Sequence, residues 1–271
     1  PTHYLTHHRP DARPNQTHPG PGMWNVAVDR PANVTRLARL ALVVTTVGLA
    51  PVVARSQEGS YSLATAQGLR LHDVKVEAVT YAGKRGVRVT ISDEARRQDQ
   101  QLSVNQQSQR ETMAVIEGTD FTNGVIEAEV AGEPASGAGE GARGFVGIAF
   151  RVQPDAKTYD AFYLRPTNGR ATDQVRRNHS AQYISHPAWT WDRLRRETPE
   201  RYESYVDLVP GAWTRIRLEV RGDTARLFVH GQEQPTLLVN DVKTGAQGRG
   251  AIALWIGPGT VAHFRDVRVR R

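Results

Sequence analysis

The sequence contains no cysteine, which excludes disulfide bonds, thiolate metal ligands and cysteine nucleophiles. It also has no uninterrupted apolar run of the roughly 18–20 residues that a membrane-spanning helix needs. With 24 glycines and 15 prolines in 271 residues, the chain is not fibrous or of low complexity. Its length is sufficient for one large all-β domain, or two small ones, with a real hydrophobic core.

The excess of positive charge is concentrated at the N-terminal end. The chain has 35 lysines and arginines against 28 acidic residues, a formal charge of +7. Residues 1–56 carry six arginines and two aspartates; subtracting these leaves 29 basic and 26 acidic groups on the other 215 residues. A charge of +3 on that part gives no reason to expect a nucleic-acid partner.

The segment 23–56 has the pattern of a signal peptide. Arginines precede 15 uncharged residues, Leu40–Ala54, which Pro51 interrupts, and Ala54-Arg55-Ser56 offers small residues at a cleavage site. We therefore expect a secreted or periplasmic protein with no stable membrane span in its mature form. A buried core helix or a retained N-terminal anchor are the alternatives. Residues 1–22, ahead of Met23, are expected to be a spurious or disordered extension.

The remaining chain, 57–271, is expected to be a single β-sandwich domain, because short runs of period-2 alternation are separated by turn residues. In Arg215–Arg221, apolar Ile216, Leu218 and Val220 alternate with charged residues, which is typical of an antiparallel strand wet on one side. The polar stretch 92–110 is expected to be a loop or a short exposed helix, and the glycine-rich 132–144 a flexible loop. The predicted strands are Val74–Tyr81, Val87–Ile91, Met113–Ile116, Val125–Val130, Phe145–Val152, Tyr159–Arg165, Gln182–Ser185, Tyr202–Val206, Thr214–Arg221, Ala225–His230, Thr236–Val239, Ala251–Ile256 and Val261–Val269.

Four segments of this strand order resemble a known family. They are the acidic alternating strand of 120–130, the Gly-Ile-x-Phe-Arg strand ending at Arg151, the turn Pro210–Trp213 with the strand after it, and the closing hairpin 250–269. Together they resemble the concanavalin A-like jelly rolls (lectin, glucanase and laminin-G-like), and most closely the bacterial exported domains named 3-keto-disaccharide hydrolase. The resemblance spans roughly residues 110–270.

The resemblance implies an all-β fold, an antiparallel two-sheet β-sandwich of the concanavalin A-like jelly-roll type, in which Trp213 fills the core. It also implies a carbohydrate-directed protein: a 3-keto-disaccharide-type hydrolase, a non-catalytic glycan-binding module or a structural interaction domain. The sequence leaves open whether the protein is an enzyme. The Glu-x-Asp-x-x-Glu motif of the jelly-roll glucanases does not occur in the chain.

The segment 159–205 is unusually dense in arginine, amide, acidic, histidine and aromatic residues. Sugar recognition needs polar groups for vicinal hydroxyls and an aromatic plate for the ring face. The alternative is that these side chains hold a long inserted segment against the sandwich, with Trp189 in a small separate hydrophobic cluster. The predicted ligand-binding residues are Arg165, Asn168, Arg170, Asp173, Gln174, Arg177, Tyr183 and Trp189.

No catalytic pair is identified by the sequence, since separation in space defines such a pair. Asp173 and Glu203 are the candidate carboxylates. No metal or cofactor is expected: His179 and His186 have no firm carboxylate partner, and no Asp-rich loop indicates the calcium site common in this fold class. The arginines of the final strand, at 265, 268, 270 and 271, indicate a solvated face or a surface attracted to anionic polysaccharide or a membrane.

Overall fold

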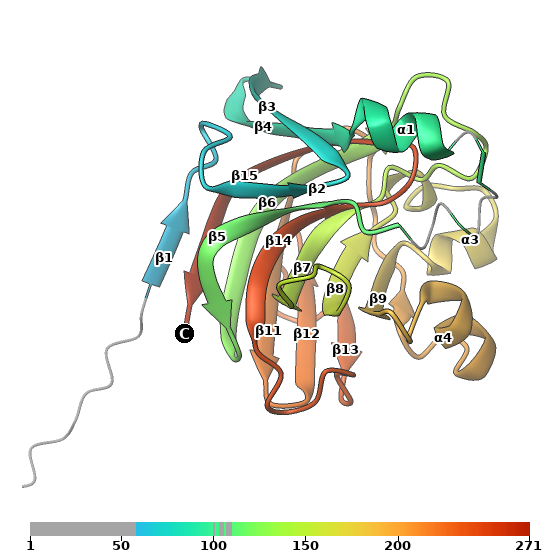
Figure 1. Ribbon diagram of the computed structural model, residues 1–271. Helices are drawn as coiled ribbons and strands as arrows, with labels where there is room; N and C mark the ends of the chain where they lie inside the picture. Colours follow the sequence, from blue (N-terminus) through green and yellow to red (C-terminus); the bar gives the residue numbers. More distant parts are fainter. Residues whose placement is uncertain (1–57, 100, 103–105, 107–109) are drawn as a thin grey trace, which may run out of the picture. The chain divides into compact units, whose positions relative to one another are not determined.

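The computed structural model describes residues 58–99, 101–102, 106 and 110–271; the expected extension 1–22 and signal peptide 23–56 lie outside this range. The described chain folds into two antiparallel sheets, of eight and seven strands (Figure 1). The predicted all-β sandwich is confirmed. No described helix is long and apolar enough to cross a membrane.

The eight-stranded sheet is built around β15, which pairs with β6 along one edge and with β4 and then β1 along the other. Its strands in spatial order are β13 (Leu237–Val239), β12 (Thr224–Val229), β11 (Thr214–Arg221), β6 (Gly124–Pro134), β15 (Thr260–Arg270), β4 (Lys84–Ile91) and β3 (Val74–Tyr81), with β1 (Glu58–Tyr61) beside the end of β15.

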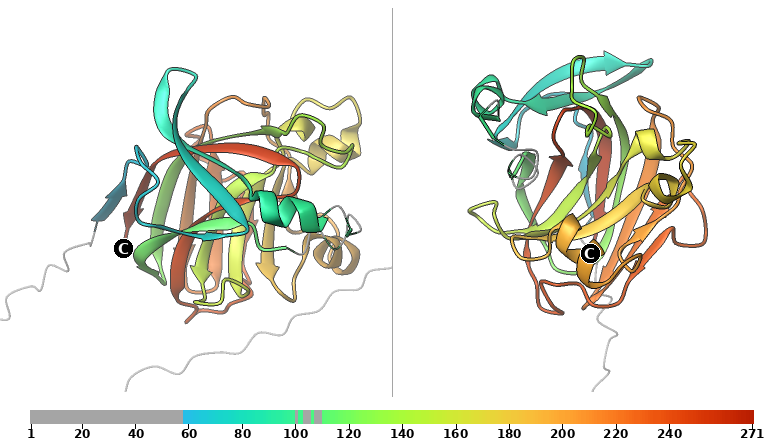
Figure 2. Two further views of the ribbon diagram at one scale, coloured as in Figure 1. Left: turned by 45° about the horizontal axis from the view of Figure 1, so that its top comes forward. Right: turned by 90° about the vertical axis from the view of Figure 1, so that its right-hand side faces the viewer.

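The seven-stranded sheet lies against the first, and its connections cross between the layers (Figure 2). Its strands in spatial order are β10 (Glu203–Ser204), β9 (Ala181–His186), β8 (Tyr159–Leu164), β7 (Val146–Val152), β14 (Gly250–Ile256), β5 (Met113–Phe121) and β2 (Leu69–His72).

The core lies between the two sheets and is rich in aromatic rings. Phe150 contacts Phe121 edge-on at 6.3 Å and Phe162 at 6.2 Å between ring centroids, and Tyr183 continues the cluster 5.4 Å from Phe162. From the other sheet, β11 contributes alternate residues, because its burial alternates as the sequence predicted. Aromatic pairs of this geometry add to the stabilisation from burial.

Several predicted boundaries are wrong. The β3–β4 turn is two residues, Ala82 and Gly83, both at positive φ, so β4 starts at Lys84 rather than at Val87. The strand predicted over Tyr202–Val206 is limited to Glu203 and Ser204. β6 continues to Pro134, so the glycine-rich loop starts later than expected. The short strands β1 and β2 were not predicted, since four residues show too little alternation.

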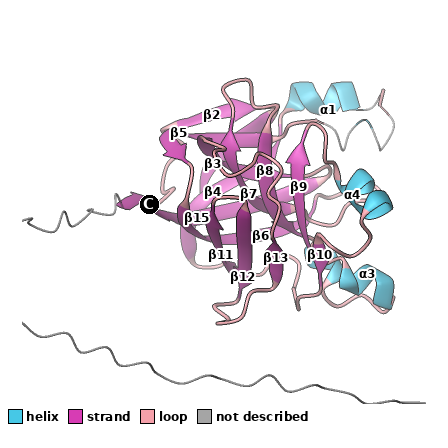
Figure 3. Ribbon diagram, turned by 90° about the horizontal axis from the view of Figure 1, so that it is seen from below, coloured by secondary structure: helices cyan, strands magenta, loops and turns pink. Residues whose placement is uncertain are grey.

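The helices are short and lie at one side of the sandwich (Figure 3). The polar stretch 92–110 contains one of them, as the sequence allowed. They are α1 (Asp93–Asp99), the 3₁₀ turn η1 (Pro166–Asn168), α3 (Gln174–Asn178) and α4 (Trp191–Glu197).

Trp213 does not fill the core, contrary to the expectation from the resemblance. The ring is half-buried and lies outside the set of core residues. Its Nε1 donates to the carbonyl oxygen of Tyr81 at 3.2 Å. Thr214, the first residue of β11, points inward. Because side chains alternate along a strand, Trp213, which directly precedes it, points to the outer face of the eight-stranded sheet.

A β-bulge divides β15. Arg265 pairs with Glu129 of β6, and Arg268 pairs with Glu127. Between these two pairs the chain advances three residues along β15 but only two along β6. Asp266, inside the bulge, has a φ of +49°. The extra residue reverses the alternation: before the bulge even-numbered residues such as Phe264 face the core, and after it Val267 does.

Arg151, at the end of β7, is completely buried and ties three chain reversals together. Its guanidinium donates five hydrogen bonds of 2.7–3.2 Å, to the carbonyl oxygens of Thr122, Gly222 and Gly245 and to the hydroxyl of Thr244. These residues belong to the β5–β6, β11–β12 and β13–β14 connections. One side chain thus satisfies backbone groups from both sheets.

We predict that Arg151→Met lowers the free energy of unfolding by more than about 3 kcal/mol, because several buried carbonyls lose their donor at about 1–3 kcal/mol each. Arg249→Met is the matched control: it removes an exposed arginine paired with Asp120, and should cost less than about 1 kcal/mol. Urea unfolding monitored by fluorescence measures both. Similar losses for the two variants would contradict the role given to Arg151.

Candidate functional site

The outer face of the seven-stranded sheet is covered, although it faces away from the core. In β7, β8 and β9 every residue is buried, so both faces of these strands are shielded from solvent. A sheet face directed outward is normally polar and exposed. This one carries aromatic and ionisable side chains together, which marks it as a candidate site.

A row of side chains crosses this outer face, because residues directly opposite one another on paired strands point to the same side. We call it the outer row. From β10 to β2 it consists of Glu203, Gln182, Tyr163, Gly147, Trp255, Met113 and His72.

Gly147 allows the aromatic part of the outer row to close up. A Cβ at this position would lie 2.6 Å from the Cα and Cβ of Tyr163 and 2.1 Å from the carbonyl oxygen of Phe162. With glycine there, the rings of Tyr163 and Trp255 approach to 4.7 Å between centroids, although β7 lies between their strands. Phe145 meets Tyr163 edge-on at 6.0 Å. The centre of the row is therefore a packed aromatic cluster.

At its β10 end the outer row becomes ionic. The carboxylate of Glu203 lies 3.0 Å from Nη1 of Arg165, is hydrogen-bonded by Arg195 of α4, and is 3.6 Å from Nε2 of His179. Arg165 also donates to the hydroxyl of Tyr163 and to Oε1 of Gln182. We call Glu203, Arg165, Arg195 and His179 the Glu203 cluster.

The charge states of the Glu203 cluster follow from its surroundings. Burial acts to raise the pKa of Glu203, but the hydrogen bonds from Arg195 and the charge of Arg165 outweigh it, so the pKa is lowered and the carboxylate stays ionised. Burial lowers the pKa of His179, and the nearby arginines oppose protonation further, against the pull of Glu203. At neutral pH His179 is therefore an uncharged imidazole beside a carboxylate.

The Glu203 cluster opens into a hollow of about 200 Å³, which we call the Glu203 hollow. Its lining residues are Asn178, His179, Glu200, Glu203, Ser204 and Tyr205. The ring of Tyr205 is partly exposed, and the Arg177 guanidinium lies 5.1 Å from its centroid. The hollow is smaller than the roughly 300 Å³ at which most ligand pockets begin, so its size suits a single sugar ring.

Of the predicted ligand-binding residues, Arg165 and Arg177 lie beside the Glu203 hollow. Asn168 is buried behind it, where its Nδ2 donates to the carbonyl oxygen of His179 at 3.0 Å. Gln174 bonds Asn178, one of the lining residues. Arg170 lies at the surface in a two-pronged ion pair with Asp207.

The other three predicted residues have different surroundings. Asp173 is the N-cap of α3, and its side chain accepts the backbone N–H of Arg176. Tyr183 faces the core, where its hydroxyl donates to Asp160 at 2.6 Å. Trp189 is partly buried under Lys243 and Arg193, which lie 4.4 and 4.0 Å from its ring centroid. Sequence reasoning did not find Arg195 or Tyr205, since neither stands near its partners in the chain.

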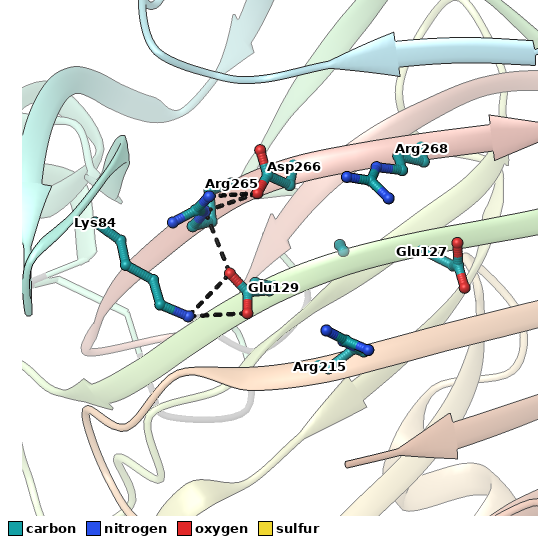
Figure 4. A pocket seen from close by; sticks show the side chains of 8 residues that line it. Lys84, Glu127, Glu129, Arg215, Arg265, Asp266 and Arg268 are labelled. Atoms are coloured by element: carbon teal, nitrogen blue, oxygen red, sulfur yellow. Dashed lines mark hydrogen bonds and ion pairs between the residues drawn. The ribbon is translucent and has the colours of Figure 1, made fainter. Parts of the chain in front are cut away.

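A second hollow, of about 370 Å³, lies on the outer face of the eight-stranded sheet; we call it the basic hollow (Figure 4). Its lining residues are Lys84, Glu127, Ala128, Glu129, Arg215, Arg265, Asp266 and Arg268. Lys84 and Arg265 both form ion pairs with Glu129, at 2.9 and 3.2 Å.

Three rings lie beside the basic hollow. Tyr81 stacks on His263 at 3.7 Å between centroids, and Trp213 meets both rings edge-on, at 5.9 and 6.3 Å. Lys84 joins them to the hollow, because its Nζ lies 5.9 Å from the Trp213 centroid. Burial, together with the charge of Arg88, lowers the pKa of His263 to about 4.

Within the described residues, no three His, Asp or Glu side chains converge as a set of metal ligands. The carboxylates that line the two hollows are instead engaged mainly by arginine and lysine.

Comparison with known proteins identifies one family. A family model described as a 3-keto-alpha-glucoside-1,2-lyase-like domain matches residues 75–270. No curated protein matches the sequence. Similar solved structures include the carbohydrate-binding module CBM66 from Bacillus subtilis (12% identity, 74% of this chain and 95% of that one, TM-score 0.47). They also include peanut lectin (7% identity, 80% of this chain and 97% of that one, TM-score 0.48). A Bacillus licheniformis β-glucanase is also similar (11% identity, 80% of this chain and 98% of that one, TM-score 0.38).

We predict that Asp173→Ala lowers the free energy of unfolding by about 1 kcal/mol, because α3 loses its N-cap, whereas Asp173→Asn has little effect, since asparagine caps equally well. Thermal unfolding of both variants tests this. If the asparagine variant is as destabilised as the alanine variant, the negative charge of Asp173 has a role other than capping.

We also predict that His263 makes the fold sensitive to acid. Its pKa is lowered in the folded state, so between pH 6.5 and about 4 the unfolded chain binds the proton more readily. Stability should fall on acidification by up to about 1.4 kcal/mol per pH unit in that window. His263→Phe keeps a ring against Tyr81 but cannot titrate. Urea unfolding across this range should show a shallower decline for the variant; equal slopes would contradict the prediction.

Proposed function

The chain belongs to the family of 3-keto-alpha-glucoside-1,2-lyase-like domains, and on that basis we propose that it is an exported, carbohydrate-directed lyase that acts at the Glu203 hollow. The observation that carries the proposal is the pairing of His179 with Glu203 on the wall of this hollow. A neutral imidazole oriented by a carboxylate is suited to removing a proton at neutral pH.

The family description defines the chemistry. In a 3-keto glucoside the proton at C2 is acidic, because it lies next to the carbonyl carbon. His179 takes that proton, and the electron pair forms an enolate with the C3 carbonyl. Collapse of the enolate restores the C3 carbonyl and forms the C1–C2 double bond, while the C1 oxygen leaves with the bonding electrons and takes a proton from water. Glu203 stabilises the imidazolium that forms. Arg195, which is partly exposed, supplies positive charge for the enolate.

A hydrolase mechanism has less support. Glycoside hydrolases pair a carboxylate with a carboxylic acid whose pKa is raised. The pKa of Glu203 is lowered, and Arg165 and Arg195 hold it as an anion. The lyase reaction needs only a base and stabilisation of negative charge, which the Glu203 cluster provides.

The second candidate is a non-catalytic glycan-binding role for the same hollow, favoured by the exposure of Tyr205. One face of this ring is next to Arg177, and the other would be available to the apolar face of a sugar. Asn178, Ser204 and Glu203 would then bind the hydroxyl groups. The predicted residues Arg165, Arg177 and Asn168 support the hollow in both candidates.

We predict that the protein eliminates 4-nitrophenol from the 3-keto derivative of 4-nitrophenyl α-glucoside, and that His179→Gln reduces kcat by about 10²–10⁴-fold. His72→Gln is the matched control, since His72 lies on β2, at the opposite edge of the seven-stranded sheet from β10, and should leave kcat unchanged. For the wild type, kcat/KM should be constant at neutral pH and fall only in acid, because the pKa of His179 is lowered.

The binding role gives a different result. The wild type would then release no nitrophenol but would bind the unmodified glucoside, and Tyr205→Ala would weaken that binding. If the wild type shows neither turnover nor binding, both candidates are contradicted.

A further inference from the structure

Two arginines in the basic hollow have no acidic partner among the residues that the structure describes. Arg215 of β11 and Arg268 of β15 lie on opposite sides of β6, and neither forms an ion pair within the described chain (Figure 4). Both side chains are exposed. Arginine without a partner, directed into a hollow from two strands, is available for an anionic ligand.

The carboxylates of the hollow are already occupied. Glu129 is opposite Arg215 in the register, but Lys84 and Arg265 bind it. Asp266 is paired with Arg265, to which it is adjacent.

Glu127 is opposite Arg268 in the register, but Arg270 lies 3.4 Å from it. Five cations, including Arg270, therefore face three carboxylates. The excess of two positive charges corresponds to the two unpaired arginines.

The bulge in β15 produces this arrangement. In a strand of unbroken alternation starting from Arg265, residues 267 and 269 would share its face. The extra residue instead places Arg268 on the outer face, and leaves Val267 and Val269 in the core. Bulges that redirect side chains occur frequently at functional sites.

The rings next to the hollow complete a sugar-binding arrangement. Trp213 is half-buried, and Nζ of Lys84, a lining residue of the hollow, lies 5.9 Å from the centroid of its ring. An aromatic face binds the apolar side of a pyranose, and arginine binds a carboxylate through two parallel hydrogen bonds. With a volume of about 370 Å³, the basic hollow has room for a sugar ring.

We propose that the basic hollow is a second glycan site, separate from the Glu203 hollow, and that it binds an acidic sugar. Arg215 and Arg268 hold the carboxylate of a uronic acid, and the pyranose ring packs toward Trp213. The site serves to hold the protein on an acidic polysaccharide; it takes no part in the reaction proposed for His179.

The experiment compares three ligands by isothermal titration calorimetry on the whole protein: trigalacturonate, its methyl ester and inorganic sulfate. The ester keeps the three rings and removes the charge. We expect trigalacturonate to bind at least tenfold more tightly than either of the others. Arg215→Gln combined with Arg268→Gln should weaken its binding at least tenfold.

Two control variants test whether the affinity comes from the basic hollow itself. Arg221→Gln removes an exposed arginine from the same strand as Arg215 and should bind as the wild type does, as should His179→Gln. Equal binding of the ester, or unchanged binding by the double arginine variant, would overturn the proposal. Sulfate as tight as trigalacturonate would overturn the sugar part, since it would indicate a small-anion site.

Discussion

The burial of Arg151 is the constraint on which the two-sheet arrangement depends. A guanidinium without water requires a full set of acceptors, and here backbone carbonyls of three separate chain reversals provide them. The ends of both sheets are thereby held at one point. Gly248 follows from the same constraint, because a Cβ there would lie 2.8 Å from Cδ of Arg151. The Phe150-Arg151 pair of β7 thus has an architectural role.

The two outer faces of the sandwich differ in a way that bears on function. On the eight-stranded sheet, charged residues alternate with core residues along the strands and form ion pairs between strands. This face is therefore open to solvent. On the seven-stranded sheet the corresponding positions are buried, and they hold Tyr163, Trp255 and the ionic end at Glu203. An open charged face suits a long ligand that lies along it, whereas a covered face with a small opening suits one sugar ring at a time.

Sequence reasoning predicted the fold well where apolar residues alternate with charged ones because only one face of the strand is buried, as in β11. It could not assign faces in β8 and β9, because both faces are buried and apolar alternation disappears. Tyr183 and Tyr163 look alike in the sequence, yet one faces the core and the other the outer row. The Arg165–Glu203 pair joins residues 38 positions apart and depends on register. The density of polar residues in the sequence indicated the region in which the Glu203 hollow lies, but it did not identify the residues that line the hollow.

The bulge in β15 also has a consequence for how this strand tolerates insertion and deletion. Its two halves follow opposite parity, and they pair with different neighbours, β4 before the bulge and β1 after it. Loss of Asp266 would remove the extra residue and give a uniform strand in which Arg265 and Arg268 still point outward and Val267 and Val269 still point inward. At the bulge, β15 can therefore lose one residue with the sorting of its interior and surface side chains unchanged.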